Sequence, residues 1–458
     1  MELLIKKGCI VNTDSTQQAD VLCKDGKITA IGKDLEFDSK PDNIIDAGGC
    51  FLLPGGIDPH VHMHLPTHAG YSSDDFISGS KAALYGGTTT IIDFVTPQKG
   101  QSLAKAIELR KSEAKNCLTD FSFHVSPVEW RDSLKDEIKD CISLEGLRSF
   151  KVYMAYKDSI GLNDEALFKV MEVVGKSGGM LTVHCELGDE IDALRNQFAS
   201  KNKLSPKFHP LSRPAELEAY AVKKAIDLAK KAQCSIYIVH VSAKKSLKFI
   251  QEAQENGQAV LAETCPQYLL LNDAYYKGEF EKTAAFVMSP PLRKKKDQKA
   301  LWNGIDDKTI ETIGTDHCAF NSAQKRMGEN DFRKIPNGAG GVEHRLPLLY
   351  TYGVSKTKIS LNRFVALTST NAAKIFGLFP TKGTIAIGSD ADILVWDPKI
   401  KNTISINNHH QNSDANIYEG MKTKGGPKMV IKNGTVVIEN GQLIKNPEKG
   451  HFLKTNPF

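Results

Sequence analysis

The chain has 458 residues, of which 41% are hydrophobic and 25% charged, a composition typical of soluble globular proteins. Its net charge of +5 is small for this length and its basic residues are scattered, which argues against a nucleic-acid partner. No apolar run reaches membrane-spanning length, and the N-terminus does not resemble a signal peptide. The nine cysteines show no CxxC spacing, which argues against a disulfide framework and favours a cytoplasmic location.

Both ends of the chain are rich in short strand-like segments. Residues 1–53 contain β-branched runs separated by glycine turns, and residues 378–458 carry two Asn-Gly hairpin signals, Asn433-Gly434 and Asn440-Gly441. Neither end is long enough to bury a robust core by itself. We therefore expect the two ends to pack together as one small β-sandwich.

The middle of the chain, residues 54–377, alternates short apolar runs with longer amphipathic stretches. Eight strand-then-helix units predict a parallel sheet closed into a (β/α)8 barrel of the TIM type, an α/β fold. A doubly wound open sheet is the alternative, but no GxGxxG follows the first strand. The predicted strands are 57–62, 88–94, 121–127, 149–154, 181–186, 236–242, 259–265 and 312–317.

Polar residues interrupt several of these strands near their carboxyl ends. Such ends converge at the mouth of a barrel, where active sites form. A single histidine of this kind is most often a satisfied core or surface group, but four histidines and an aspartate together indicate a metal site. Imidazole and carboxylate groups suit zinc and similar divalent ions. The candidate residues are His60, His62, Lys151, His184, His240 and Asp316.

Lys151 is unusual because it lies within the apolar stretch "LRSFKVYMAY". A charged lysine in a buried strand is costly unless its stem carries the amine out to solvent. Alternatively, burial lowers its pKa, and the neutral amine reacts with carbon dioxide to give a carbamate. Such an anion has two oxygens and could bridge two metal ions.

Ten segments along the chain together resemble the dihydropyrimidinase/D-hydantoinase family of cyclic amidohydrolases, and the resemblance covers essentially the whole chain. They are "GGIDPHVH", "GGTTTIIDF", "FKVYMAYKD", "LTVHCELGD", "YIVHVSA", "ETCPQYL", "SPPLR", "GTDHCAF", "IPNG" and "STNAAKIFGLFP". The resemblance implies a barrel with a β-sandwich, assembled as a homotetramer, and a pair of zinc ions bridged by a carboxylated Lys151 (N6-carboxylysine). Matched by motif, one zinc would be held by His60, His62, Lys151 and Asp316, and the other by Lys151, His184 and His240.

The same resemblance assigns roles around the substrate. Tyr156 would stabilise the oxyanion, Ser289 and Asn337 would bind the imide edge of the ring through backbone groups, and Asp316 would carry the proton. The implied reaction is attack of a metal-bridged hydroxide on a 5,6-dihydropyrimidine or 5-substituted hydantoin, which gives an N-carbamoyl amino acid. The sequence does not choose between these substrates.

Two other functions stay open at this point. An allantoinase-type cyclic amidohydrolase would use the same ligands, and a non-catalytic relative of dihydropyrimidinase would share the fold. His64 stands where dihydroorotases of this superfamily carry an arginine, which argues against that activity. We expect His64 to be a loop residue and Glu263 to have a structural hydrogen-bonding role. The loop "MHLPTHAGYSSDD", with Tyr153, should form the pocket wall that meets the ring substituent.

Overall fold

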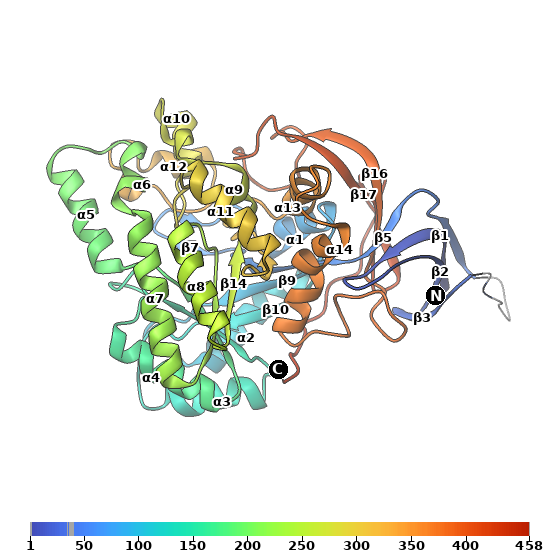
Figure 1. Cartoon of the computed structure of the whole chain (residues 1–458), viewed down its shortest axis with the longest axis horizontal. Helices are drawn as coiled ribbons and strands as arrows, with labels where there is room; N and C mark the ends of the chain where they lie inside the picture. The colour runs from blue at the N-terminus through green and yellow to red at the C-terminus, as the bar shows by residue number, and fades with distance from the viewer. Residues whose placement is uncertain (1, 34, 36–40, 458) are drawn as a thin grey trace.

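The computed structural model describes residues 2–33, 35 and 41–457, and its larger part is a barrel of eight parallel strands (Figure 1). The two ends of the sheet meet at Val61, which pairs with His317, while the Asp316 amide donates to the His60 carbonyl at 2.9 Å. This closure confirms the predicted (β/α)8 barrel. In sheet order the strands are β15 (Thr312–Ile313), β14 (Val260–Thr264), β13 (Ser235–Ile238), β12 (Met180–His184), β11 (Ser149–Tyr153), β10 (Asp120–Val125), β9 (Thr88–Val95) and β6 (Gly56–Val61).

Amphipathic helices cover the outside of the barrel. In α4 (Asp164–Lys176), the buried residues Leu167, Val170, Met171 and Val174 follow the 3.6-residue period and face the strands. The other long helices are α1 (Phe76–Tyr85), α2 (Leu103–Glu113), α3 (Leu134–Ser143), α5 (Gly188–Ser200), α7 (Ala215–Ala232), α8 (Lys244–Glu255) and α11 (Lys295–Asp306). Short helices are α6 (His209–Ser212), α9 (Pro266–Leu270), α10 (Phe280–Thr283), α12 (Ser322–Arg326), α13 (Arg345–Leu349), α14 (Leu361–Val365) and α15 (Asn371–Ile375).

Two barrel strands end four residues earlier than the apolar pattern predicts. β13 stops at Ile238 rather than near residue 242, and β15 stops at Ile313 rather than near residue 317. Beyond these ends, His240 (φ 40°) and Asp316 (φ 54°) adopt left-handed backbone conformations that leave the strand ladder.

Strands from both ends of the chain form a second, nine-stranded sheet at the right of Figure 1. The β2–β3 hairpin folds back on this sheet, since the Ala391 amide donates to the Gly26 carbonyl at 2.8 Å. The sheet thereby encloses its own apolar core, as the predicted β-sandwich requires. Its strands are β1 (Glu2–Val11), β2 (Thr16–Lys24), β3 (Lys27–Gly32), β4 (Asn43–Asp46), β5 (Phe51–Pro54), β16 (Ile393–Thr403), β17 (Lys422–Lys432), β18 (Thr435–Glu439) and β19 (Gln442–Leu443).

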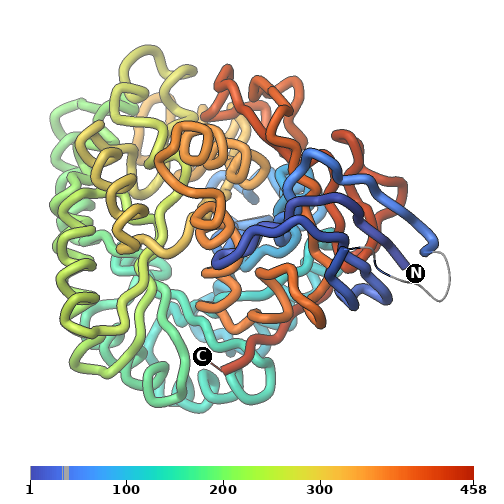
Figure 2. The backbone as a smooth tube through the Cα atoms, turned by 45° about the vertical axis from the view of Figure 1, so that its right-hand side comes forward, coloured from blue at the N-terminus to red at the C-terminus, as the bar shows by residue number. Residues whose placement is uncertain are grey.

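A buried charge cluster joins the sandwich to the base of the barrel. The Lys382 ammonium contacts the carboxylates of Asp120, Asp390 and Asp392 at 2.5, 2.9 and 2.8 Å. Asp120 opens β10 and also accepts a hydrogen bond from the His451 amide of the C-terminal segment. That segment continues beside β10, where Phe452 pairs with Phe121, and it ends next to the blue-green part of the barrel in Figure 2.

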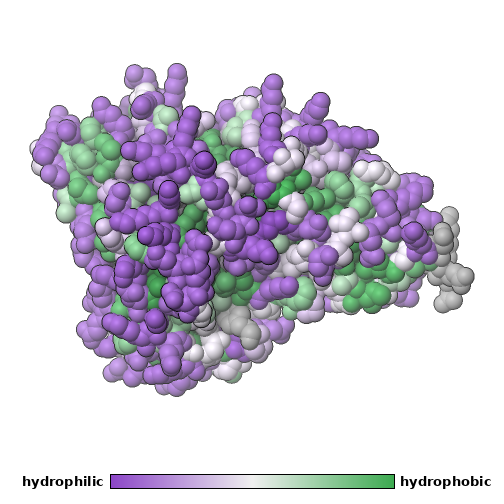
Figure 3. Space-filling model, in the orientation of Figure 1, coloured by the Kyte–Doolittle hydropathy of each residue, from purple (hydrophilic) through white to green (hydrophobic). Residues whose placement is uncertain are grey.

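The face shown in Figure 3 is mostly hydrophilic, and its hydrophobic atoms gather in small separate areas. Among the described residues, no helix combines the length and the apolar character needed to cross a membrane.

Candidate active site

The structure brings all six predicted metal-binding residues together at the carboxyl-terminal mouth of the barrel, where they line one cavity of about 860 Å³. His60 Nε2 lies 3.2 Å and His62 Nε2 3.1 Å from Asp316 Oδ1, and His184 Nδ1 lies 2.9 Å from His240 Nε2. His60 is the next-to-last residue of β6, Lys151 lies within β11 and His184 ends β12. Barrel strands and the turns that directly follow them thus supply every member of the set.

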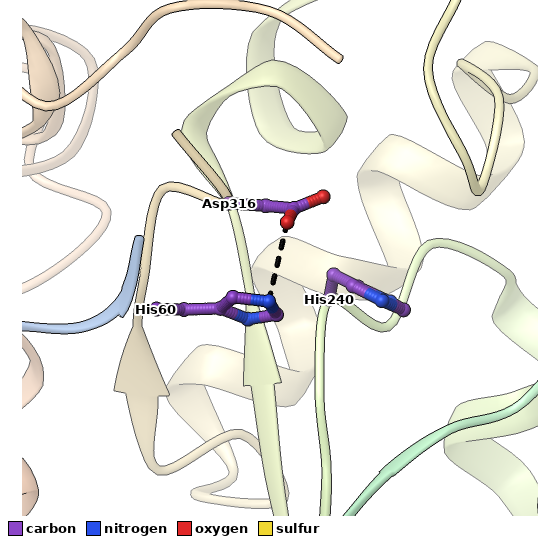
Figure 4. Close-up of side chains that lie close together, drawn as sticks. All are labelled: His60, His240 and Asp316. Carbon is purple, nitrogen blue, oxygen red and sulfur yellow. Dashed lines mark ion pairs between the residues drawn. The ribbon is translucent and has the colours of Figure 1, made fainter. Parts of the chain in front are cut away.

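The close approach of these groups fits a bound cation. One potential ligand atom from each of His60, His240 and Asp316 lies within 4.8 Å of the other two (Figure 4). The buried His62 Nδ1 has no hydrogen-bond partner among the described residues. Nitrogen and carboxylate ligands in this arrangement suit zinc or a similar divalent ion.

Two carboxylates, those of Glu263 and Asp316, lie beside His60. His60 Nδ1 lies 2.7 Å from Glu263 Oε1. Burial lowers the pKa of His60, but the charges of Glu263 and Asp316 outweigh it and bring that pKa to about 9. A positive charge is therefore favoured at this point, whether a proton or a metal ion supplies it.

Lys151 is fully buried, and its amine has no hydrogen-bond partner among the described residues. The aromatic rings of Phe94 and Tyr153 lie 5.0 Å from its nitrogen. Burial lowers the pKa of Lys151 to about 8, against the opposing charges of Asp316 and Glu263. The stem does not reach solvent, so the alternative of an outward-directed lysine is wrong.

Tyr156, Ser289 and Asn337 also line the cavity. The Tyr156 ring centroid lies 5.5 Å from that of His184, and burial raises the pKa of its phenol, which keeps the hydroxyl protonated. No hydrogen bond to the backbone N–H or C=O of Ser289 or Asn337 is formed within the described chain. These two residues therefore present free donors and acceptors at the cavity wall.

Comparisons with known proteins agree with this geometry. A family model described as "Amidohydrolase family" matches residues 51–437. The chain is 42% identical to D-hydantoinase of Geobacillus stearothermophilus, covering 99% of this chain and 96% of the relative, and 43% identical to dihydropyrimidinase of Rattus norvegicus, covering 100% and 89%. The chain belongs to the dihydropyrimidinase/D-hydantoinase branch of the amidohydrolase family.

Solved structures carry the same fold. The crystal structure of dihydropyrimidinase from Brevibacillus agri superimposes with a TM-score of 0.97 at 43% identity and covers 100% of this chain and 99% of that one. A structure described as an L-hydantoinase (dihydropyrimidinase) from Arthrobacter aurescens has a TM-score of 0.90 at 31% identity, over 99% of both chains. The family resemblance read from the sequence is confirmed.

Within this amidohydrolase barrel, buried hydrogen bonds orient the candidate ligands. Glu263 also accepts from the His240 amide at 3.1 Å and from the Tyr237 hydroxyl at 2.8 Å, which accords with the structural role expected for it. His184 Nε2 lies 2.9 Å from Glu186 Oε2, and Arg213 pairs with the same carboxylate at 2.5 Å. Such contacts fix which ring nitrogen faces the site.

Glu186 and Arg213 are not among the residues predicted from the sequence. Glu186 follows His184 by two residues, so its proximity could have been inferred from the strand end. Arg213 lies before α7, and nothing in the local pattern connects it with the site. Arg213 is nevertheless buried, and its ion pair with Glu186 avoids the free-energy cost of burying an unpaired charge.

The loop after β6 differs in part from expectation. Leu65 lines the cavity, but Met63 is buried in the barrel core against Gly79, so it does not form the pocket wall. His64 stacks on Tyr71 with ring centroids 3.9 Å apart, and neither residue lines the cavity. His64 is a loop residue, as its sequence context indicates.

Proposed function

We propose that this protein hydrolyses a ring C–N bond of a 5,6-dihydropyrimidine or a 5-substituted hydantoin and releases an N-carbamoyl amino acid. The observation that carries the proposal is the convergence of four histidines, a buried unpartnered lysine and an aspartate on one cavity of a hydantoinase-like barrel. The full-length similarity to hydantoinases and dihydropyrimidinases supports the same reaction class, hydrolysis of cyclic amides.

The residues present fit a pair of divalent ions. His60, His62, Lys151 and Asp316 would hold one ion, and Lys151, His184 and His240 the other, with Lys151 carboxylated as the shared ligand. The buried, unpartnered Lys151 amine supports this assignment. As a carbamate, its two oxygens would bind the metal ions, whereas the free amine has no partner. Two bound zinc ions supply Lewis acidity, which lowers the pKa of water and polarises the scissile carbonyl.

The residues of the chain bind the substrate and move the proton. The free backbone groups of Ser289 and Asn337 complement the alternating N–H and C=O groups of an imide edge. Tyr156, protonated because of burial, donates a hydrogen bond to the carbonyl oxygen as negative charge develops there. Asp316 accepts the proton of the attacking water and delivers it to the departing ring nitrogen.

A substrate panel on the purified, zinc-loaded protein tests this function. The panel contains 5,6-dihydrouracil, hydantoins with small and bulky 5-substituents, and allantoin. Formation of N-carbamoyl products from dihydrouracil or hydantoins, and little turnover of allantoin, is the expected result. Preferential turnover of allantoin would establish the allantoinase alternative, and absence of bound zinc together with absence of turnover would establish a non-catalytic scaffold.

We further propose a homotetramer with a cytoplasmic location and a small-molecule substrate as its binding partner. The assembly proposal draws support from the family resemblance. Light scattering coupled to size-exclusion chromatography should give four times the chain mass of 50.3 kDa. A mass equal to one or two chains would contradict the tetramer.

A further inference from the structure

A buried lysine outside the metal-binding set lies beneath the two segments that line the substrate side of the cavity. Lys325 belongs to α12, and only 3% of its surface is exposed. Its ammonium donates to the carbonyl oxygens of Val287 at 2.9 Å, Pro336 at 2.8 Å and Gly338 at 2.7 Å. Three N–H donors thus meet three acceptors.

These acceptors lie directly beside the candidate substrate-binding residues. Val287 precedes Ser289 by two positions, and Pro336 and Gly338 flank Asn337 on either side. The Gly338 amide also donates to the Val287 carbonyl at 3.0 Å, so the two segments are joined to each other as well as to Lys325. The neighbours of Asn337 are hydrogen-bonded, while its own backbone groups stay free for a ligand.

We infer that Lys325 is a positioning residue, which holds the Val287–Ser289 and Pro336–Gly338 segments at the spacing needed to bind the imide edge of the ring. This inference rests on the proposed function for its substrate, and on the three carbonyl contacts for its geometry. Lys325 does not itself line the cavity.

The charge on Lys325 matters for this role. Burial lowers its pKa to about 7. The protonated form has three N–H donors, whereas the neutral amine has two, so the three carbonyl oxygens favour the charged form. Within the described chain, no carboxylate forms an ion pair with Lys325, and the backbone carbonyls compensate for its burial.

Substitution of Lys325 by methionine tests the inference, because methionine keeps the length and removes the donors. Arg326→Met is the matched control, since Arg326 is the next residue of α12 and is exposed. Both variants are compared with the parent as zinc-loaded, full-length protein. Hydrogen exchange followed by mass spectrometry reports on peptides containing residues 287–289 and 337–339, and kinetics use dihydrouracil and hydantoin.

K325M should exchange faster in both peptides, and its KM should rise roughly 10- to 100-fold with a smaller change in kcat, because displaced binding groups lose their alignment. Its zinc content should equal that of the parent, and R326M should behave like the parent. Glutamine retains two donors, so K325Q should recover part of the affinity. It also replaces K325M in the comparison if the methionine variant does not fold.

Two results would overturn the inference. Unchanged exchange in both peptides would mean that Lys325 does not hold the segments, and faster exchange with an unchanged KM would mean that it supports folding only. Failure of the parent protein to hydrolyse either substrate would contradict the proposed function. The exchange data would still decide separately whether Lys325 holds the two segments.

Discussion

At the residue scale, Lys151 gives the sharpest test of the metal centre. Substitution by alanine should remove the shared ligand, and the protein should lose at least one metal ion and nearly all activity. Metal analysis with activity measurements checks this, and short carboxylic acids added to K151A should restore part of both. Exposed Lys139→Ala is the control. Electron density for an unmodified Lys151 amine in an active, fully metallated crystal would exclude the carboxylated form.

Asp316 is expected to combine metal binding with proton transfer. Asp316→Asn keeps an oxygen that can coordinate a metal but cannot carry the proton, so kcat should fall by ~10²–10⁴-fold. Metal content and single-turnover rates separate the two roles. A variant with metal bound and near-normal turnover would rule out the proton-transfer role.

Glu263 should set the metal affinity although it is not a proposed ligand. It accepts from His60 at 2.7 Å, so Glu263→Gln removes the charge that orients the ring and favours a cation beside it. Zinc affinity should decrease by about 10- to 100-fold, a typical effect of losing such a partner. Competition with a chelator measures it, and exposed Glu255→Gln is the control. Equal zinc affinity in both variants would contradict this role.

At the scale of elements, the loop after β6 should help to select the ring substituent. Leu65 and Tyr153 line the cavity, and each methylene of an apolar pocket is worth ~1–3 kcal/mol of selectivity. Leu65→Ala or Tyr153→Ala should therefore change the ratio of kcat/KM for bulky hydantoins to that for dihydrouracil, with metal content constant. His64→Ala, outside the cavity, is the control and should spare both metals. Parallel losses on both substrates would mean that the loop only supports the site.

The strand pattern predicted the barrel and the residues at its mouth, because apolar runs alternate with helices and polar residues follow the runs. It could not predict the left-handed turns at His240 and Asp316, which depend on contacts with distant segments. Met63 shows the same limit, since its apolar side chain suits both a pocket wall and a core. Arg213 and Lys325 contact partners that lie far away in the sequence. Such contacts cannot be predicted from a local periodicity.

At the scale of the whole molecule, the charge cluster around Lys382 should stabilise the contact between barrel and sandwich. Lys382→Met removes the cation that the three carboxylates share and leaves the buried Asp392 without its lysine partner, so the free energy of unfolding should fall by about 3–5 kcal/mol. Thermal and urea unfolding measure the loss, and exposed Lys401→Met on β16 is the control. A variant as stable as this control would contradict the role of the cluster.

The same cluster has a defined pH dependence. Burial lowers the pKa of Lys382, but the charges of Asp392, Asp120 and Asp390 outweigh it and raise that pKa above its usual value. A raised lysine pKa contributes stability that is fully present below the unfolded pKa and is lost as pH rises through the folded pKa. The difference in stability between K382M and the parent should therefore persist at neutral pH and shrink in strongly alkaline solution.

The pairing of β5 with β16 has a consequence for how the protein is made. Leu53 lies opposite Leu394, so β5 lacks its β16 partner until the whole barrel has been synthesised. Phe452 reaches its place beside Phe121 later still. During this interval, β5 and the base of the barrel are exposed to aggregation. Completion of the sandwich is thus a late step of folding, and its speed should govern the yield of folded protein.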